Sequence, residues 1–139
     1  MTEELLKIKK DLSEKLKKDR FEHTVGVMYT ASSLAMRYGE DIQKALTDGL
    51  LHDCGKFCSA KEQMKLCRKK EIELTKSEIE MPALIHAKLG AYLAEHEYGI
   101  KDRDILDAIT YHTTGRPDMA MREKIVYIAD YIEPNRAEI

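Results

Sequence analysis

The stretch GLLHDCGK, residues 49–56, places His52 and Asp53 side by side directly after an apolar run. Both side chains need water or a polar partner, so their position at the end of an apolar run requires an explanation. One interpretation is that a helix simply ends here, because Gly55 is a common stop signal. The other is that His52 and Asp53 bind a metal ion. The surrounding sequence bears on both interpretations.

Helical periodicity accounts for most of the apolar pattern around this stretch. Apolar residues spaced by three and four predict helices over residues 5–16, 20–38, 42–53, 82–99, 102–113 and 119–132. Gly39 predicts the end of the second helix, Asp41 the N-cap of the third, and Pro82 the first turn of the fourth. Segment 57–81 is rich in Lys and Glu and is predicted to be a loop with one or two short polar helices. Because no alternating apolar strand occurs, the predicted fold class is all-α.

Length and composition indicate a single globular domain. The 139 residues can bury a core, and the net charge of −2 excludes binding to nucleic acid or to an anionic membrane by a bulk basic field. We expect an amphipathic N-terminal helix, residues 1–19, to pack on a domain that spans residues 20–139. The apolar runs are too short to cross a bilayer, and the N-terminus lacks the apolar core of a signal peptide. Three cysteines without a C-x-x-C motif indicate reduced thiols, so we expect a cytoplasmic protein.

Histidines and one aspartate form a candidate metal-binding set. Four histidines lie on or at the end of predicted helices, beside apolar residues: His23, His52, His86 and His112. Each alone could be a buried histidine that donates to a carbonyl, or a helix C-terminal histidine that suits the dipole. Asp130, within YIADYI, needs a partner only if it is buried. Taken together, imidazoles and carboxylates are ligands of Zn, Mn and Fe, and a mixed nitrogen and oxygen set favours octahedral Fe or Mn.

The order of these residues resembles a known signature. His23, His52-Asp53 and Asp130 are similar to the H…HD…D pattern of the HD-domain superfamily, which are all-α, metal-dependent phosphohydrolases. Longer strings resemble one subfamily: RFEHTVGV (20–27), GLLHDCGK (49–56), LIHAKLGAYLA (84–94), YHTTGR (111–116) and EKIVYIADYIEPNR (123–136). They are similar to the YqeK-type family of symmetrical bis(5'-nucleosyl)-tetraphosphatases, bacterial enzymes that cleave diadenosine tetraphosphate into two ADP. The resemblance implies an HD-domain helical bundle from about Arg20 onward.

The resemblance also implies roles for individual residues. The ligands of iron, or of a similar divalent ion such as Mn, Co or Mg, would be His23, His52, Asp53 and Asp130. The nucleotide phosphate site would be lined by Arg20, His86, His112, Thr113, Asp130 and Arg136. In many HD proteins the positions resembling His86 and His112 bind a second metal; we favour phosphate there and one tight metal. The family further implies an adenine nucleotide substrate and a homodimer. Because relatives usually continue for several helices, we expect that a C-terminal extension beyond Ile139 is missing.

The expected chemistry is hydrolysis by an activated water. An ion held by two His and two Asp would keep open positions, and it can lower the pKa of bound water from about 15.7 toward 7. Asp53 would both ligate the ion and direct the proton of the water, and Lys56 would stabilise the developing phosphate charge. Arg20 lies one helical turn before His23, so both can face one site. Lys56 and Arg136 could instead be ordinary surface residues.

Two other functions are open from the sequence. An HD-type hydrolase could act on nucleoside mono-, di- or triphosphates, or the chain could be a non-catalytic nucleotide-sensing module. The sensing module predicts lost ligands, whereas all four core ligands occur here. Tyr127 and Tyr131, at helical spacing, are predicted to be core residues rather than base-stacking platforms.

Overall fold

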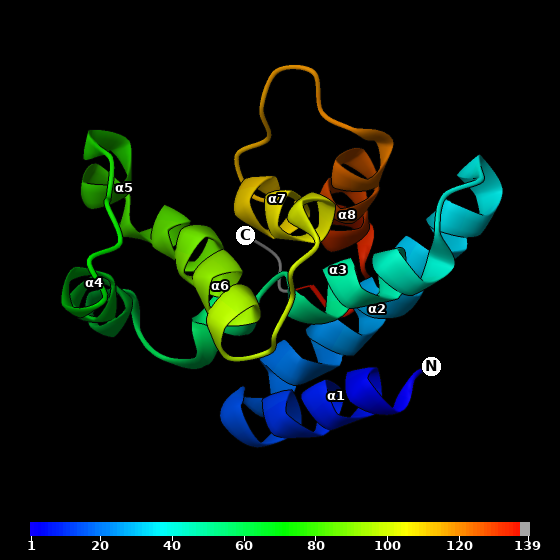
Figure 1. The fold of residues 1–139 in the computed structure, drawn as a ribbon, viewed down its shortest axis with the longest axis horizontal. Coiled ribbons are helices and arrows are strands. Elements are labelled where there is room, and N and C mark those ends of the chain that lie inside the picture. The colour runs from blue at the N-terminus through cyan, green and yellow to red at the C-terminus, as the bar shows by residue number, and fades with distance from the viewer. Residues whose placement is uncertain (137–139) are drawn as a thin grey trace.

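The computed structural model describes residues 1–136, and the predicted domain end at Ile139 lies outside the described residues. Within residues 1–136 the chain forms helices and no strand, which confirms the all-α prediction. Figure 1 shows α1 (Glu3–Lys15), α2 (Lys18–Tyr38), α3 (Ile42–Leu51), α4 (Ala60–Lys69), α5 (Lys76–Glu80), α6 (Ile85–His96), α7 (Arg103–Tyr111) and α8 (Met121–Ile132). Two short 3-10 helices complete the described chain: η1 (Cys54–Phe57) and η2 (Pro82–Leu84).

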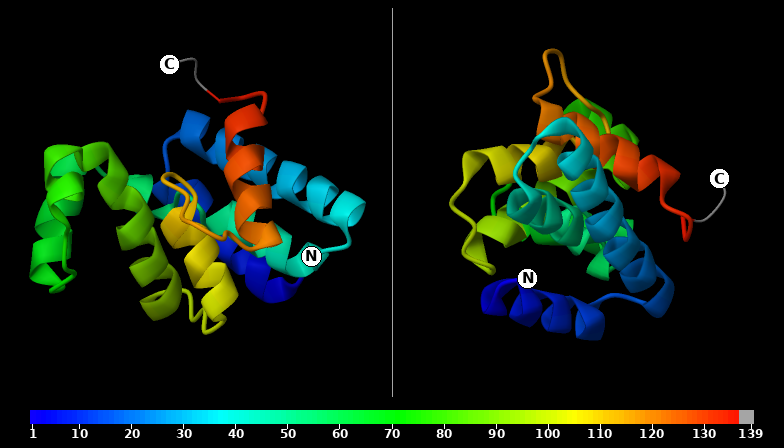
Figure 2. Two further views of the ribbon diagram at one scale, coloured as in Figure 1. Left: turned by 90° about the horizontal axis from the view of Figure 1, so that it is seen from above. Right: turned by 90° about the vertical axis from the view of Figure 1, so that its right-hand side faces the viewer.

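The core is formed where α2, α3, α6, α7 and α8 meet. Helix α2 packs along α3, α6 packs on α7 and on η1, and α8 lies against α2, α3 and α7. Helix α1 runs beneath α2 and α3 in Figure 1, and its apolar residues Leu5, Ile8 and Leu12 are buried in the same core. Helices α4 and α5 lie beyond α6, on the side away from α8 (Figure 2). The helices that carry the candidate ligands are therefore the central ones.

Local signals set several helix ends where the sequence predicts them. Gly39 ends α2 in the left-handed conformation, with φ of 71°. The side chain of Asp41 caps α3 by accepting a hydrogen bond from the Lys44 backbone amide at 2.9 Å. Pro82 begins a 3-10 helix rather than an α-helix, and α6 itself starts at Ile85.

The end of α3 differs from the prediction in a way that shapes the site. The α-helix ends at Leu51, before the predicted end near Asp53, and η1 follows it. Gly55 is not a left-handed stop residue, since its φ is not positive. Instead, a Cβ at Gly55 would overlap the carbonyl oxygen of His86. Glycine therefore lets η1 pack tightly against α6, which brings Asp53 close to His86.

The prediction that Tyr127 and Tyr131 are core residues is wrong. Their exposed fractions are 42% and 72%. Helix α8 instead buries Ile125, Val126 and Ala129, because these residues face the small side chains of α2 and α3. None of the helices within residues 1–136 combines the length and apolarity needed to span a bilayer.

Candidate metal centre

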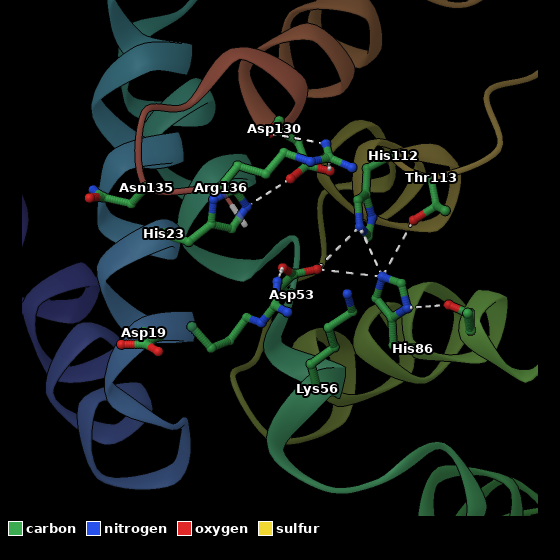
Figure 3. A pocket seen from close by; sticks show the side chains of 12 residues that line it. Asp19, His23, Asp53, Lys56, His86, His112, Thr113, Asp130, Asn135 and Arg136 are labelled. Atoms are coloured by element: carbon green, nitrogen blue, oxygen red, sulfur yellow. Dashed lines mark hydrogen bonds and ion pairs between the residues drawn. The ribbon is translucent and has the colours of Figure 1, made fainter. Parts of the chain in front are cut away.

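The predicted site residues converge on one cleft of about 360 Å³ (Figure 3). Nine of them line it: Arg20, His23, Asp53, Lys56, His86, His112, Thr113, Asp130 and Arg136. His52 is the exception, because it is completely buried behind the lining. Asp19 and Asn135 also line the cleft and were not predicted. The Thr113 hydroxyl lies 3.4 Å from His86 Nε2 at one wall.

Four of these residues form a cluster that we call the tetrad: His23, His52, Asp53 and Asp130. One ligand atom of each lies within 4.8 Å of those of the other three. His23 Nε2 is 2.8 Å from Asp130 Oδ1, and His52 Nε2 is 3.5 Å from the same oxygen. His52 Nε2 is also 3.3 Å from Asp53 Oδ2. Because α2, the end of α3 and α8 each contribute, the tetrad exists only in the folded chain.

His52 shows that the tetrad fits a metal ion. Its Nδ1–H donates to the carbonyl oxygen of Gly49 at 2.7 Å. In the neutral ring Nε2 then carries a lone pair that can bind a metal, and within the described chain this nitrogen is a buried polar atom without a hydrogen-bond partner. A buried unpaired nitrogen is costly unless something satisfies it. With two carboxylates beside it, this nitrogen completes a donor set typical of a divalent ion.

The charges of the tetrad favour a cation as well. Burial alone lowers the pKa of His52, but Asp53 and Asp130 outweigh burial and raise that pKa to about 10. Burial raises the pKa of Asp130, yet its close contact with His23 and the positive charge of His52 hold that pKa well below its ordinary value. Burial likewise raises the pKa of Asp53, but the charge of His52 and the close contact of His112 hold that pKa well below its ordinary value. Two ionised carboxylates thus lie in a space that attracts positive charge.

A second cluster, the triad of Asp53, His86 and His112, shares Asp53 with the tetrad. The Nδ1–H groups of His86 and His112 donate to the carbonyls of Ala83 and Ile109, at 2.8 and 2.7 Å. Both Nε2 atoms are therefore acceptors in the neutral rings, and they face each other at 3.2 Å. Burial lowers the pKa of His86 to about 3, so His86 brings no proton to this contact at neutral pH. Unprotonated Nε2 atoms can hold a cation, whereas a phosphate oxygen would need a donor.

Three cationic side chains surround the two clusters. Arg20 donates to Asp53 Oδ2 at 3.0 Å, and Arg136 donates to the backbone carbonyl of Asp130 at 3.3 Å. Lys56 lies at the cleft wall in Figure 3 and forms no ion pair with any residue of the described range 1–136. These three groups can neutralise an anionic ligand that enters the cleft, and the two guanidinium groups can also hold it by paired hydrogen bonds.

Glu133 is a further site residue, which the sequence did not reveal. It is 3% exposed and accepts a hydrogen bond from His23 Nδ1–H at 2.8 Å. The backbone and side-chain amides of Asn135 donate to it at 2.9 and 3.1 Å. Since a carboxylate only accepts, Glu133 fixes the proton on Nδ1 and turns His23 Nε2 toward Asp130. The sequence placed Glu133 one helical turn after Asp130, which is compatible with a position near the site. However, an acidic residue just before a proline usually lies at an exposed helix end, so Glu133 was not predicted as a site residue.

Space for Glu133 comes from Gly26 on α2. A Cβ at Gly26 would overlap the carboxylate of Glu133. Gly26 lies one helical turn after His23, so both face the same side of α2. Glu133 therefore fits over Gly26 and accepts the hydrogen bond from His23 at the same place.

Comparisons with known proteins agree with this arrangement. The family model described as HD domain matches residues 20–135. The chain is 49% identical to the symmetrical bis(5'-nucleosyl)-tetraphosphatase of Bacillus subtilis, over 91% of this chain and 67% of that protein. A protein of the same name from Halalkalibacterium halodurans is 48% identical, over 87% of this chain and 64% of that protein. A crystal structure from Clostridium acetobutylicum, described as a predicted HD superfamily hydrolase involved in NAD metabolism, matches with a TM-score of 0.88 and 45% identity, over 95% of this chain and 70% of that one. The chain therefore spans about two thirds of the length of the curated relatives it matches.

Proposed function

Since the chain belongs to the HD domain family and, within it, to the symmetrical bis(5'-nucleosyl)-tetraphosphatases, we propose that it is a metal-dependent phosphohydrolase that cleaves diadenosine tetraphosphate into two ADP. The observation that carries this proposal is the tetrad. Two histidines and two aspartates from three separate segments converge beside a cleft with cationic walls. The names of the relatives support the substrate, and the free lone pair of His52 supports the metal.

We propose iron as the ion of the tetrad, with manganese, cobalt and magnesium as alternatives. Two nitrogen and two carboxylate donors suit an octahedral ion of this kind better than structural zinc. When bound, such an ion supplies Lewis acidity, which makes water nucleophilic at neutral pH and neutralises charge on the phosphoryl group. A second, weaker ion is proposed for the triad, which has one carboxylate where the tetrad has two.

The side chains of the protein supply binding, orientation and proton transfer. Asp53 belongs to both clusters, so its carboxylate is placed to direct the proton of the attacking water. The water oxygen forms a bond to the second phosphorus of the tetraphosphate. The bond from that phosphorus to the central bridging oxygen breaks, and this oxygen leaves on the other ADP. Lys56 and Arg136 would hold phosphate oxygens and neutralise the charge that develops during this displacement.

Arg20 links the chemistry to substrate binding. One of its guanidinium nitrogens donates to Asp53 Oδ2, which orients the carboxylate. The rest of the guanidinium lies at the cleft, where it can donate to phosphate. The roles of His86, His112 and Thr113 in phosphate binding stay predictions.

Product chromatography tests the proposed reaction. Protein purified without chelator would be incubated with diadenosine tetraphosphate, alone and with added iron, manganese or cobalt. We expect ADP as the only product, because symmetric cleavage gives no AMP and ATP. A substrate panel of nucleoside mono-, di- and triphosphates is the comparison, and preference for any of them would contradict the proposal. Elemental analysis of the same preparation identifies the ion.

We also propose a cytoplasmic location and a homodimer. The cysteines Cys54, Cys58 and Cys67 are all free thiols, which supports a reducing compartment. Light scattering on the purified protein tests the dimer.

A further inference from the structure

A second cleft opens beside the metal centre, and the mechanism above does not use it. We call it the side cleft. Its volume is about 700 Å³, and it shares Asp19, Arg20, Lys56, Ala83 and His86 with the metal cleft. Its other walls are formed by Lys17, which precedes α2, by Phe57 at the end of η1, and by the first turn of α4. The two clefts are therefore continuous at a junction that contains Arg20 and Lys56.

The shape of the substrate requires a second direction out of the metal centre. A dinucleoside tetraphosphate carries a nucleoside at each end, and symmetric cleavage occurs at its middle. With the middle at the tetrad, each of the two halves needs its own space beside the metal centre. The metal cleft extends toward Asn135 and Arg136, whereas the side cleft extends toward Phe57 and α4. At about 360 Å³ the metal cleft is near the lower end of the range for small-molecule sites, which is too little for both halves.

The side chains of the side cleft suit a nucleoside diphosphate. Lys17 and Lys56 form no ion pair with any other residue in the described part of the chain, so both ammonium groups can meet phosphate. Phe57 is 38% exposed, although most apolar side chains of η1 and its surroundings are buried. An exposed aromatic ring on the wall of a polar cleft offers a stacking face for a base. The carboxylates of Asp19 and Glu62 can accept hydrogen bonds from ribose hydroxyls.

We propose that the side cleft binds the second nucleoside diphosphate half of the substrate, with its base against Phe57 and its phosphates held at the junction by Arg20 and Lys56. The other half lies toward Asn135 and Arg136. Arg20 and Lys56 then flank the bond that breaks, which explains why these two cations line both clefts. This inference rests on the proposed function, because it divides that substrate between two subsites.

The effect of Phe57→Ala on turnover is the first test. We expect kcat/KM of the metal-loaded enzyme for diadenosine tetraphosphate to fall about tenfold, the scale of one lost stacking contact. Phe57→Tyr should keep most of the activity, because it keeps the ring. Tyr38→Ala is the matched control: it removes another exposed aromatic, outside both clefts, and should leave kcat/KM unchanged. Equal rates for Phe57→Ala and Tyr38→Ala, or equal losses for Phe57→Ala and Phe57→Tyr, would overturn the assignment.

Calorimetric titration with ADP gives a test that needs no turnover. The metal-loaded protein should bind two ADP per chain, and Phe57→Ala should weaken one of the two sites about tenfold. Lys17→Glu, which changes an exposed side chain at the wall of the side cleft, should weaken the same site. One ADP per chain in the wild type contradicts the second subsite. If the wild type binds two ADP but does not cleave diadenosine tetraphosphate, the proposed function fails while the subsite stands.

Discussion

The tetrad and the triad share Asp53 but differ in the negative charge they hold. The tetrad has a second carboxylate, Asp130, and outside it a third carboxylate, that of Glu133, accepts a hydrogen bond from His23. The triad has only Asp53, and its histidines donate to neutral carbonyls. Attraction of a divalent ion in a buried site grows with the number of ionised groups around it, and a carboxylate behind a histidine makes that histidine more basic. Because each cluster contains two histidines, we expect the extra negative charge of the tetrad to make it the tighter of the two sites.

The largest expected effect comes from Asp53→Asn, because both clusters lose their shared charge. We expect kcat to fall roughly 10³-fold or more and both ions to be lost. Turnover and metal content would be measured on the same preparation. Asp48→Asn is the control, since Asp48 is an equally buried carboxylate on α3 whose partner is Arg122, at 3.1 Å, rather than a ligand. Metal retained by Asp53→Asn, or lost equally by Asp48→Asn, would contradict the shared role.

The next effect separates the two clusters directly. Asp130→Asn should lower the affinity of the tight ion by more than about 100-fold, beyond the loss expected for an outer partner. His86→Asn should leave the tight ion in place and remove only the weak one. Metal content after dialysis against a graded chelator series distinguishes them. If His86→Asn removed the tight ion and Asp130→Asn did not, the triad rather than the tetrad would be the tight site.

We expect Glu133 to contribute less to the metal affinity of the tetrad than a ligand does, but by a measurable amount. Glu133→Ala should weaken the tight ion by about 10- to 100-fold, because His23 loses the acceptor that orients it. Gly26→Ala should act in the same direction without altering any polar group, since its Cβ displaces Glu133. Glu133→Gln, which still accepts from Nδ1–H, should lose less than Glu133→Ala. Glu22→Gln, an exposed change on α2, is the control; unchanged metal affinity in Gly26→Ala would argue against this positioning role.

The last prediction concerns the pH dependence of metal binding, where the expected effect of a single pH unit is about tenfold. His52 has its pKa raised to about 10, so a proton must leave before a metal binds, and the affinity of the tetrad should rise by about tenfold per pH unit below that value. His86, with its pKa lowered to about 3, contributes no such slope above pH 4. In the metal-free protein, His52 stabilises the fold below about pH 6.5, and this contribution is lost as the pH rises through about 10. Metal titrations in buffered chelator, from pH 6 to 9, measure the slope.

Most of the fold was predictable because its signals are local. Gly39 and Asp41 act through their own backbone and side chain, and both ended or capped a helix where expected. Gly55, like Gly39, follows an apolar helical run, but it has a different role. It has no side chain because α6 packs directly against it. The prediction for Tyr127 and Tyr131 was wrong for a related reason. Helical spacing shows that two residues share a face, but it does not show which face the neighbouring helices cover.

The sequence by itself determined the all-α class, the types of ligand and their order along the chain, because periodicity and ligand chemistry are properties of single residues and their near neighbours. Only the tertiary structure decided that Asp53 joins two clusters, that Glu133 supports His23, and that Arg20 and Lys56 lie between two clefts. These relations join residues up to 110 positions apart, and they depend on which helices pack together.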